Sequence, residues 1–226
     1  IKTILISLLF IPFLVFAQSV ALPSAGLTPE SPFYFIDRLG EGLREFFTFN
    51  PEGKARLQIT FAAERVAEIK VILETKGVDA KGLEVAQSRL EANIAKAADI
   101  VTEQKTEGKD VSILAKELDD QFEAPKTALE EAFEEQERAL KAREKELRRQ
   151  ILAARQAGDT TQVENLVQQL GQVKAQKELL ELKEEEAEEA LEAEEERIEE
   201  EMEAKEEAEK AIKEAEKEKQ EIVDEA

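Results

Sequence analysis

The chain has 226 residues and a formal net charge of −21, because 52 Asp and Glu residues outnumber 31 Lys and Arg residues. It contains no Cys and no His, which excludes disulfides, thiolate or imidazole metal sites, cysteine nucleophiles and Ser-His-Asp triads. Charged residues make up 37% of the chain and aromatic residues only 5%, a balance typical of long solvated helices. The excess of acidic residues argues against a nucleic-acid partner, because binding to phosphate groups needs clustered Lys and Arg residues.

Residues 1–17 are predicted to be a secretory signal peptide. Lys2 precedes the apolar run Ile4 to Phe16, and Ala17 supplies a small residue for cleavage before Gln18. An uncleaved membrane anchor is the alternative, but the run is shorter than the roughly 20 apolar residues that a span needs. The signal predicts a secreted or extracytoplasmic location, in the periplasm or at the cell surface. Because the sequence begins at Ile1 and not at Met, we expect it to be a fragment.

A helical bundle domain is expected over residues 33–126, after a proline-containing linker over 18–32. Ser31-Pro32 predicts the start of a helix that runs to about Phe47. Asn50-Pro51 opens a second helix that ends near Gly77, and Asp79 is expected to cap a third that ends near Gly108. Seven of the twelve aromatic residues lie between Phe33 and Phe61, and we expect this cluster to form the hydrophobic core.

An antiparallel coiled-coil hairpin is expected over residues 127–189. Its first helix continues from about Asp110 to Ala157, because the apolar stripe stays in phase across Pro125. Gly158 is expected to end that helix, and Asp159 or Thr161 to cap the next one. The short connection predicts that the helices fold back on each other. The returning helix carries two apolar rows at heptad spacing, Val163, Leu170 and Leu191 in one and Leu166, Val173, Leu180 and Ala187 in the other.

Residues 190–226 are expected to form an extended acidic helix. From Glu178 to Ala226 there are 24 acids and 7 bases, a net charge of −17. The heptad rows are solidly apolar only as far as Leu180, and beyond it charged residues interrupt them, so we favour a solvated single helix over a further coiled-coil seam.

No catalytic, cofactor-binding or metal-binding residue is predicted, and no cofactor is expected. Carboxylate pairs occur throughout the chain, so none stands out as an acid/base site. No segment fits the calcium-binding loop of EF-hands. Gly40-Glu41-Gly42 lacks the third glycine of a dinucleotide-binding loop. Carboxylate chemistry would need a deep pocket lined by buried acids near residues 33–61.

Three short stretches resemble a known family. Gly26 to Tyr34 reads GLTPESPFY, Phe46 to Pro51 reads FFTFNP, and Ala63 to Glu68 reads AERVAE. They are similar to motifs of the exported or membrane-tethered helical proteins of bacteria and archaea catalogued as domain of unknown function 5667. The match is strongest over residues 26–77, about a quarter of the chain. The resemblance implies export and an all-helical fold, and it supplies no catalytic residue.

The sequence as a whole predicts an all-α protein: a small helical bundle with a long antiparallel coiled-coil hairpin and an extended acidic C-terminal helix. We expect a non-enzymatic exported protein that presents an interaction surface to a protein partner at the cell envelope. The alternative is a low-affinity cation-binding or sensing protein that uses its Glu-rich C-terminal helix. No nucleic-acid partner is expected, membrane contact is expected only through a retained signal segment, and the oligomeric state is left open.

Overall fold

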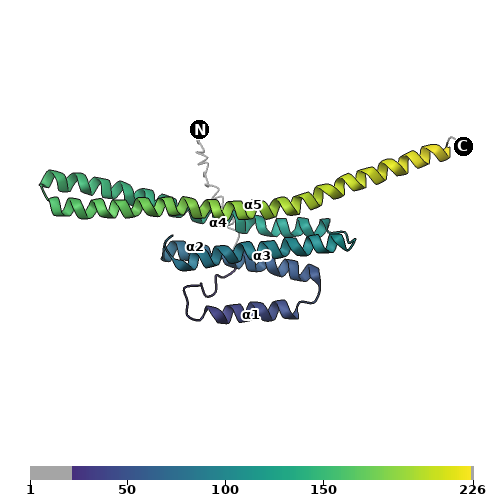
Figure 1. Cartoon of the computed structure of the whole chain (residues 1–226), viewed down its shortest axis with the longest axis horizontal. Helices are drawn as coiled ribbons and strands as arrows, with labels where there is room; N and C mark the ends of the chain where they lie inside the picture. The colour runs from purple at the N-terminus through teal and green to yellow at the C-terminus, as the bar shows by residue number, and fades with distance from the viewer. Residues whose placement is uncertain (1–21, 225–226) are drawn as a thin grey trace, which may run out of the picture.

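The computed structural model describes the backbone of residues 22–224, with side chains described over 22–193 and at Glu196. This part of the chain forms five α-helices and no strand, which confirms the all-α class. The predicted signal peptide and its cleavage site lie outside the described residues. The helices are α1 (Tyr34–Phe47), α2 (Pro51–Thr75), α3 (Lys81–Thr106), α4 (Ser112–Ala157) and α5 (Thr160–Asp224) (Figure 1).

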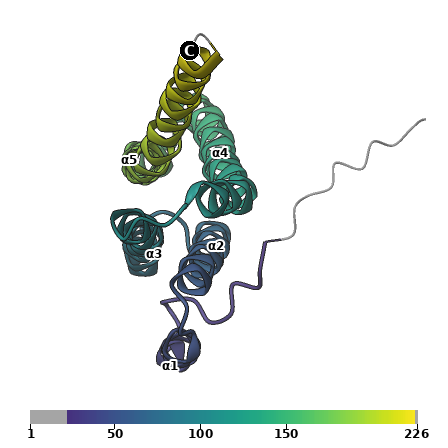
Figure 2. The same cartoon turned by 90° about the vertical axis from the view of Figure 1, so that its right-hand side faces the viewer.

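The helices lie in three layers (Figure 2). Helix α1 alone forms one outer layer, α2 and α3 form the middle layer, and the antiparallel pair of α4 and α5 forms the third. The α4–α5 pair extends past one end of α2 and α3 as a two-helix arm, and α5 leaves the bundle at the other end (Figure 1). No helix of the described part combines the length and the apolar character needed to cross a membrane.

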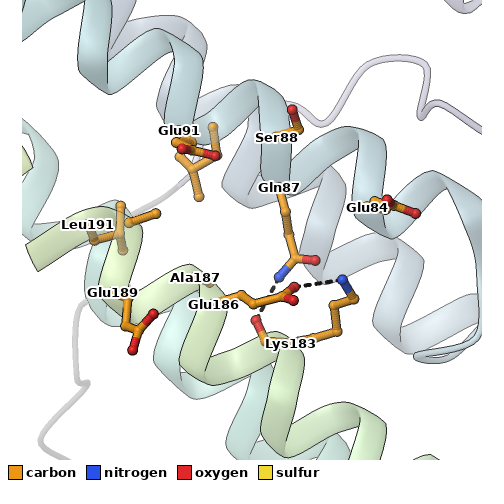
Figure 3. Close-up of a pocket in the computed structure, with 11 residues that line it drawn as sticks. Glu84, Gln87, Ser88, Glu91, Lys183, Glu186, Ala187, Glu189 and Leu191 are labelled. Atoms are coloured by element: carbon orange, nitrogen blue, oxygen red, sulfur yellow. Dashed lines mark hydrogen bonds and ion pairs between the residues drawn. The ribbon is translucent and has the colours of Figure 1, made fainter. Parts of the chain in front are cut away.

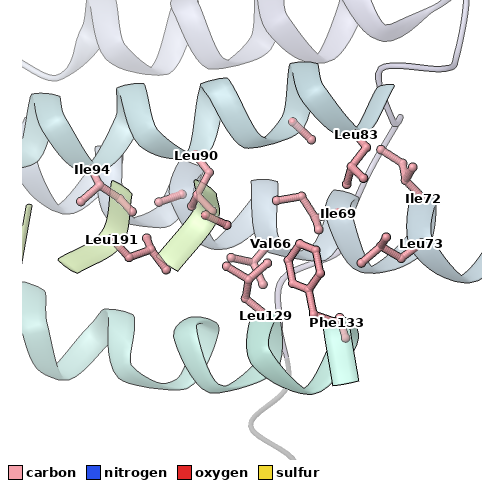
Figure 4. Close-up of a cluster of buried hydrophobic side chains, with 14 of the residues drawn as sticks. Val66, Ile69, Ile72, Leu73, Leu83, Leu90, Ile94, Leu129, Phe133 and Leu191 are labelled. Atoms are coloured by element: carbon pink, nitrogen blue, oxygen red, sulfur yellow. The ribbon is translucent and has the colours of Figure 1, made fainter. Parts of the chain in front are cut away.

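The hydrophobic core lies between α2, α3, α4 and α5 (Figure 4). Every third or fourth residue of α2 points into it, as the heptad spacing of that helix predicts. Leu191, near the middle of α5, packs in the same cluster as Leu90 and Ile94 of α3. Leu191 of the first heptad row therefore closes the bundle. The labelled core residues are Val66, Ile69, Ile72, Leu73, Leu83, Leu90, Ile94, Leu129, Phe133 and Leu191.

The prediction that the aromatic cluster forms the core is wrong for α1. Of the seven aromatic residues between Phe33 and Phe61, only Tyr34 and Phe61 are buried. The side of α1 that faces α2 carries Tyr34 and Glu41. The polar groups of these two residues pair with side chains of α2. Because that side makes the contact, the opposite, apolar side of α1 faces outward. Five phenylalanines are consequently exposed: Phe33, Phe35, Phe46, Phe47 and Phe49.

The linker is tied to the bundle, and it supplies the cap of α3. The carboxylate of Glu30 accepts a hydrogen bond of 2.5 Å from the backbone N–H of Gly82, in the first turn of α3. A carboxylate is favoured there because the first N–H groups of a helix lack partners within the helix. Asp79, the cap expected from the sequence, instead accepts a hydrogen bond of 2.5 Å from Gln176 of α5. That prediction was wrong.

The hairpin forms as predicted. Helix α4 runs unbroken through Pro125 and ends at Gly158, whose φ of 75° is a left-handed conformation that suits glycine. Asp159 caps α5, because its carboxylate accepts a hydrogen bond of 2.9 Å from the N–H of Gln162. The alternative cap, Thr161, lies inside α5. Leu166, Val173, Leu180, Ala187 and Leu191 of the predicted rows are buried.

Candidate functional site

A groove of about 400 Å³ lies where α5 crosses α3 (Figure 3). The side-chain amide of Gln87 donates a hydrogen bond of 2.7 Å to the backbone carbonyl of Lys183, which ties the two helices together. The Lys183 ammonium pairs with Glu186 at 2.6 Å. Carboxylates of both helices, including those of Glu84 and Glu91, line the groove together with apolar side chains such as Leu90 and Leu191. The charged groups of the groove are therefore acidic apart from one lysine that is already paired.

The chemistry of this groove is that of a cation or basic side-chain contact. Ser88 is its only hydroxyl group, and none of the residues that line it is a His, Cys or Lys positioned as a base beside that hydroxyl. Within the described residues, no group of three or more acidic side chains is arranged to hold a metal ion. The groove thus offers negative charge.

A second acidic region lies beside the seam between α4 and α5. Burial raises the pKa of the Glu184 carboxyl, and the neighbouring carboxylates of Glu188, Glu137, Glu134 and Glu181 raise it further. The repulsion among these groups marks a local excess of negative charge. It lies close to the point where the bundle joins the arm, next to Leu129 and Phe133.

Farther along the arm, basic side chains compensate the acids. Glu144 of α4 accepts hydrogen bonds from Arg148 at 2.7 Å and from Lys177 of α5 at 3.2 Å. These two partners, Arg148 first, lower the pKa of the Glu144 carboxyl. The arm therefore carries paired charges along its sides, and its seam is held by apolar side chains.

The most deeply buried polar cluster lies between α1 and α2. Arg65 of α2 is 1% exposed, and its guanidinium lies 2.5 Å from a carboxylate oxygen of Glu41 and 3.0 Å from one of Glu68. The guanidinium also donates a hydrogen bond of 2.7 Å to the hydroxyl of Tyr34, whose hydroxyl in turn donates one of 3.3 Å to Glu68. Arg89 of α3 stacks over the Tyr34 ring, 5.1 Å from its centroid.

Burial sets the ionisation of this cluster. It raises the pKa of the Tyr34 hydroxyl to about 12, and it raises the pKa of the Glu68 carboxyl to about 7 although Arg65 acts in the opposite direction. Two carboxylates therefore share one buried guanidinium, and one of them titrates near neutral pH. The cluster forms the polar contact between α1 and α2.

Sequence reasoning did not find the residues of this cluster. Tyr34 belongs to the first stretch quoted for the resemblance, and Arg65 and Glu68 belong to the third, so two stretches about 30 residues apart meet in space. The only available signal was that these stretches resemble motifs. As ordinary residues on two amphipathic helices, they gave no sign that they would be buried.

Comparisons of the chain with models of protein families, with curated proteins and with solved structures find no match. The resemblance of residues 26–77 to domain of unknown function 5667 therefore stays a prediction.

Proposed function

We propose that the protein is a non-enzymatic, exported scaffold that presents the C-terminal part of α5 to a protein partner at the cell envelope. One observation carries this proposal. Helix α5 has 65 residues, and Leu191 near its middle is the last residue whose side chain is described as buried. Beyond it the backbone of α5 leaves the bundle, and its last part extends past the ends of the other four helices (Figure 1).

The length and charge of this segment support an interaction role. From Glu192 to Asp224 the helix has 33 residues and extends about 50 Å at 1.5 Å per residue. Its sequence contains 16 acidic and 6 basic residues, a net charge of −10. An acidic helix with few apolar residues finds little stabilisation within its own chain, and it can pair with a helix or a surface that carries the opposite charge.

The rest of the molecule acts as a base for this helix. The seam of the hairpin and the α3–α5 contact through Gln87 fix the first half of α5 against the bundle. A fixed base holds the distal helix at a defined direction, which lowers the entropy cost of binding compared with a flexible tail. The paired charges of the arm leave the distal part of α5 as the main uncompensated charge.

Site-specific photocrosslinking in the producing cells tests this proposal. A photoreactive residue placed at position 205, 212 or 219 of α5 should give a discrete crosslinked product. The same residue at Leu152, which is exposed on the arm, is the matched control and should give none. Replacing Glu199, Glu200 and Glu201 by Gln should weaken the crosslink. Crosslinking from Leu152 alone, or from no position, would show that the distal helix is not the interaction surface.

The alternative function, weak cation binding, is favoured by the carboxylates around Glu184. Their mutual repulsion raises the pKa of Glu184, and a bound cation would relieve that repulsion. Calorimetric titration with calcium should then show binding that disappears when Glu184 and Glu188 are both replaced by Gln. If the calcium titration gave the same heat for the wild-type protein and the double variant, or no heat for either, this alternative would be excluded.

A further inference from the structure

Helix α1 is amphipathic, and its apolar side faces away from the protein. Its other side carries Tyr34 and Glu41, which are buried against α2, and Arg44, which pairs with Glu64 of α2 at 3.3 Å. The outward side, together with the residues that flank the helix, exposes eight large apolar side chains to between 50% and 81%. This α1 apolar face consists of Phe33, Phe35, Ile36, Leu39, Leu43, Phe46, Phe47 and Phe49.

The α1 apolar face is too large to be an ordinary feature of a protein surface. A phenylalanine side chain offers about 200 Å² and the aliphatic residues somewhat less, so the exposed fractions amount to about 900 Å². The largest apolar patch of a typical soluble monomer measures about 300 to 600 Å². The excess indicates a surface that is covered in the working state of the protein.

The width of the face indicates what covers it. Successive residues of a helix are rotated by about 100°, which places the exposed side chains from Phe35 to Phe33 around about half of the helix circumference. A coiled-coil partner covers only the narrower a and d stripe. Pairing with one helix of a second copy would leave Phe33 and Phe35, at the two edges, in water. A planar apolar medium covers the whole half.

The position of α1 in the fold favours the same occupant. Helix α1 is the outermost layer on one side of the molecule, with α5 on the opposite side (Figure 2). A flat surface can therefore meet α1 along its length, while the acidic α5 stays on the far side. Around α1 itself the charges balance closely, because Glu41 is neutralised by Arg65 and Arg38 at 2.5 Å each. Attraction to anionic headgroups is not needed for contact.

We propose that the α1 apolar face is a membrane-docking surface that lies in the interface of a lipid bilayer. The phenylalanines and leucines enter the boundary between headgroups and acyl chains, to a depth of about 5 to 10 Å. Docking depends on apolar contact with zwitterionic lipid and changes little with salt. It places the bundle between the membrane and α5, so the distal helix faces the aqueous side. This membrane contact is separate from any made by the apolar segment 4–16.

A single tryptophan reports the docking, because the chain contains none. Phe46→Trp places the reporter on the α1 apolar face, and Leu152→Trp is the matched control at an exposed apolar site on the arm. The full chain is mixed with phosphatidylcholine vesicles whose acyl chains are brominated. We expect the emission of the first variant to shift to the blue and to be quenched several-fold more strongly than that of the second.

Quenching of the tryptophan at position 46 distinguishes this docking from binding through residues 4–16. Binding through residues 4–16 would bring the chain to the vesicle without burying position 46. Adding Leu39→Ser and Leu43→Ser to Phe46→Trp should lower the quenching about tenfold or more, because two apolar contacts are lost. Vesicle-bound protein without quenching at position 46, or with equal quenching at position 152, would overturn the proposal. A blue-shifted emission without vesicles, together with a dimer in sedimentation, would overturn it in favour of a second copy.

Discussion

Replacing Arg65 by Met should free α1 from the bundle. Arg65 is 1% exposed, and it is the cation shared by the Glu41 and Glu68 carboxylates. Removing it leaves Glu41 with only the partly exposed Arg38 and Glu68 with only the Tyr34 hydroxyl, and breaking a buried ion pair in this way costs about 3 to 5 kcal/mol when no rearrangement relieves it. Release of α1 brings both carboxylates into water, so it becomes the favourable response. Full unfolding of α2 to α5 is not required.

Limited trypsin digestion of the folded protein detects this release. Arg38 and Arg44 lie on α1, and cleavage there should be faster in Arg65→Met than in the wild-type protein. Circular dichroism during urea denaturation should show a smaller change, because the apolar core lies outside α1. The effect should weaken as the pH falls from 8 to 5. Burial raises the pKa of Glu68 to about 7 even beside Arg65, the loss of the guanidinium raises that pKa further, and protonation removes one of the buried charges.

Arg44→Met is the matched control for this experiment. Arg44 also joins α1 to α2, but its side chain is 61% exposed, and an exposed ion pair contributes about 0 to 1 kcal/mol. Digestion at Arg38 should therefore remain close to the wild-type rate. The reasoning would be refuted if Arg65→Met left both the digestion rate at Arg38 and the urea midpoint unchanged, or if Arg44→Met had the larger effect.

Three other comparisons test separate parts of the fold. The folded state holds a proton on Glu68 up to a pH of about 7, whereas the unfolded chain loses it near 4.5, so the stability from this group decreases as pH rises between these values. Urea denaturation should show the wild-type protein losing up to about 3 kcal/mol relative to Glu68→Gln over that window, and a constant difference would contradict the assignment. Leu180→Ala, at a residue with 0% exposure in the seam, should cost about 2 to 5 kcal/mol, against less than 1 kcal/mol for Leu182→Ala at a half-exposed position. Gly158→Ala places a side chain at a φ of 75° and should lower the free energy of unfolding by about 1 kcal/mol. Gly171→Ala adds helix propensity at an exposed site and should raise it by about 1 kcal/mol. The melting temperatures of the two variants should therefore shift in opposite directions.

The helices and the hairpin could be predicted because their signals are local. Pro51 and Gly77 bound α2, Gly158 ends α4, and the spacing of residues such as Leu180 sets the buried side of α5. Pro125 was expected inside a helix because the apolar stripe keeps its phase there, and the structure confirms this. Each inference needed only residues within a few turns of one another.

The contacts of α1 and the cap of α3 could not be predicted, because they depend on residues far apart in the chain. Glu30 caps α3 at Gly82 across 52 positions. An apolar stripe shows that a helix has an apolar side, but it does not say whether that side meets the protein. Here the polar side of α1 meets α2 through Arg65, whose burial had no local signal.

The candidate surfaces were foreseen to a similar, limited degree. The acidic character of α5 follows from its composition. Its position opposite α1 is visible only in the structure (Figures 1 and 2). The groove beside Gln87 and Lys183 arises because α5 crosses α3, and this contact between residues far apart in the chain had no local signal. Sequence reasoning assigned no site residues, and the structure supplies surfaces for test.

The antiparallel pairing of α4 with α5 determines how the molecule responds to mechanical force. Tension applied along the distal part of α5 pulls that helix parallel to the seam, so Leu166, Val173 and Leu180 are loaded together in shear. Rupture then requires many apolar contacts to break at once. A force that lifts α1 from α2 acts perpendicular to its short contact and can break the polar pairs one after another. The same protein is therefore stiff when pulled along α5 and compliant where α1 attaches.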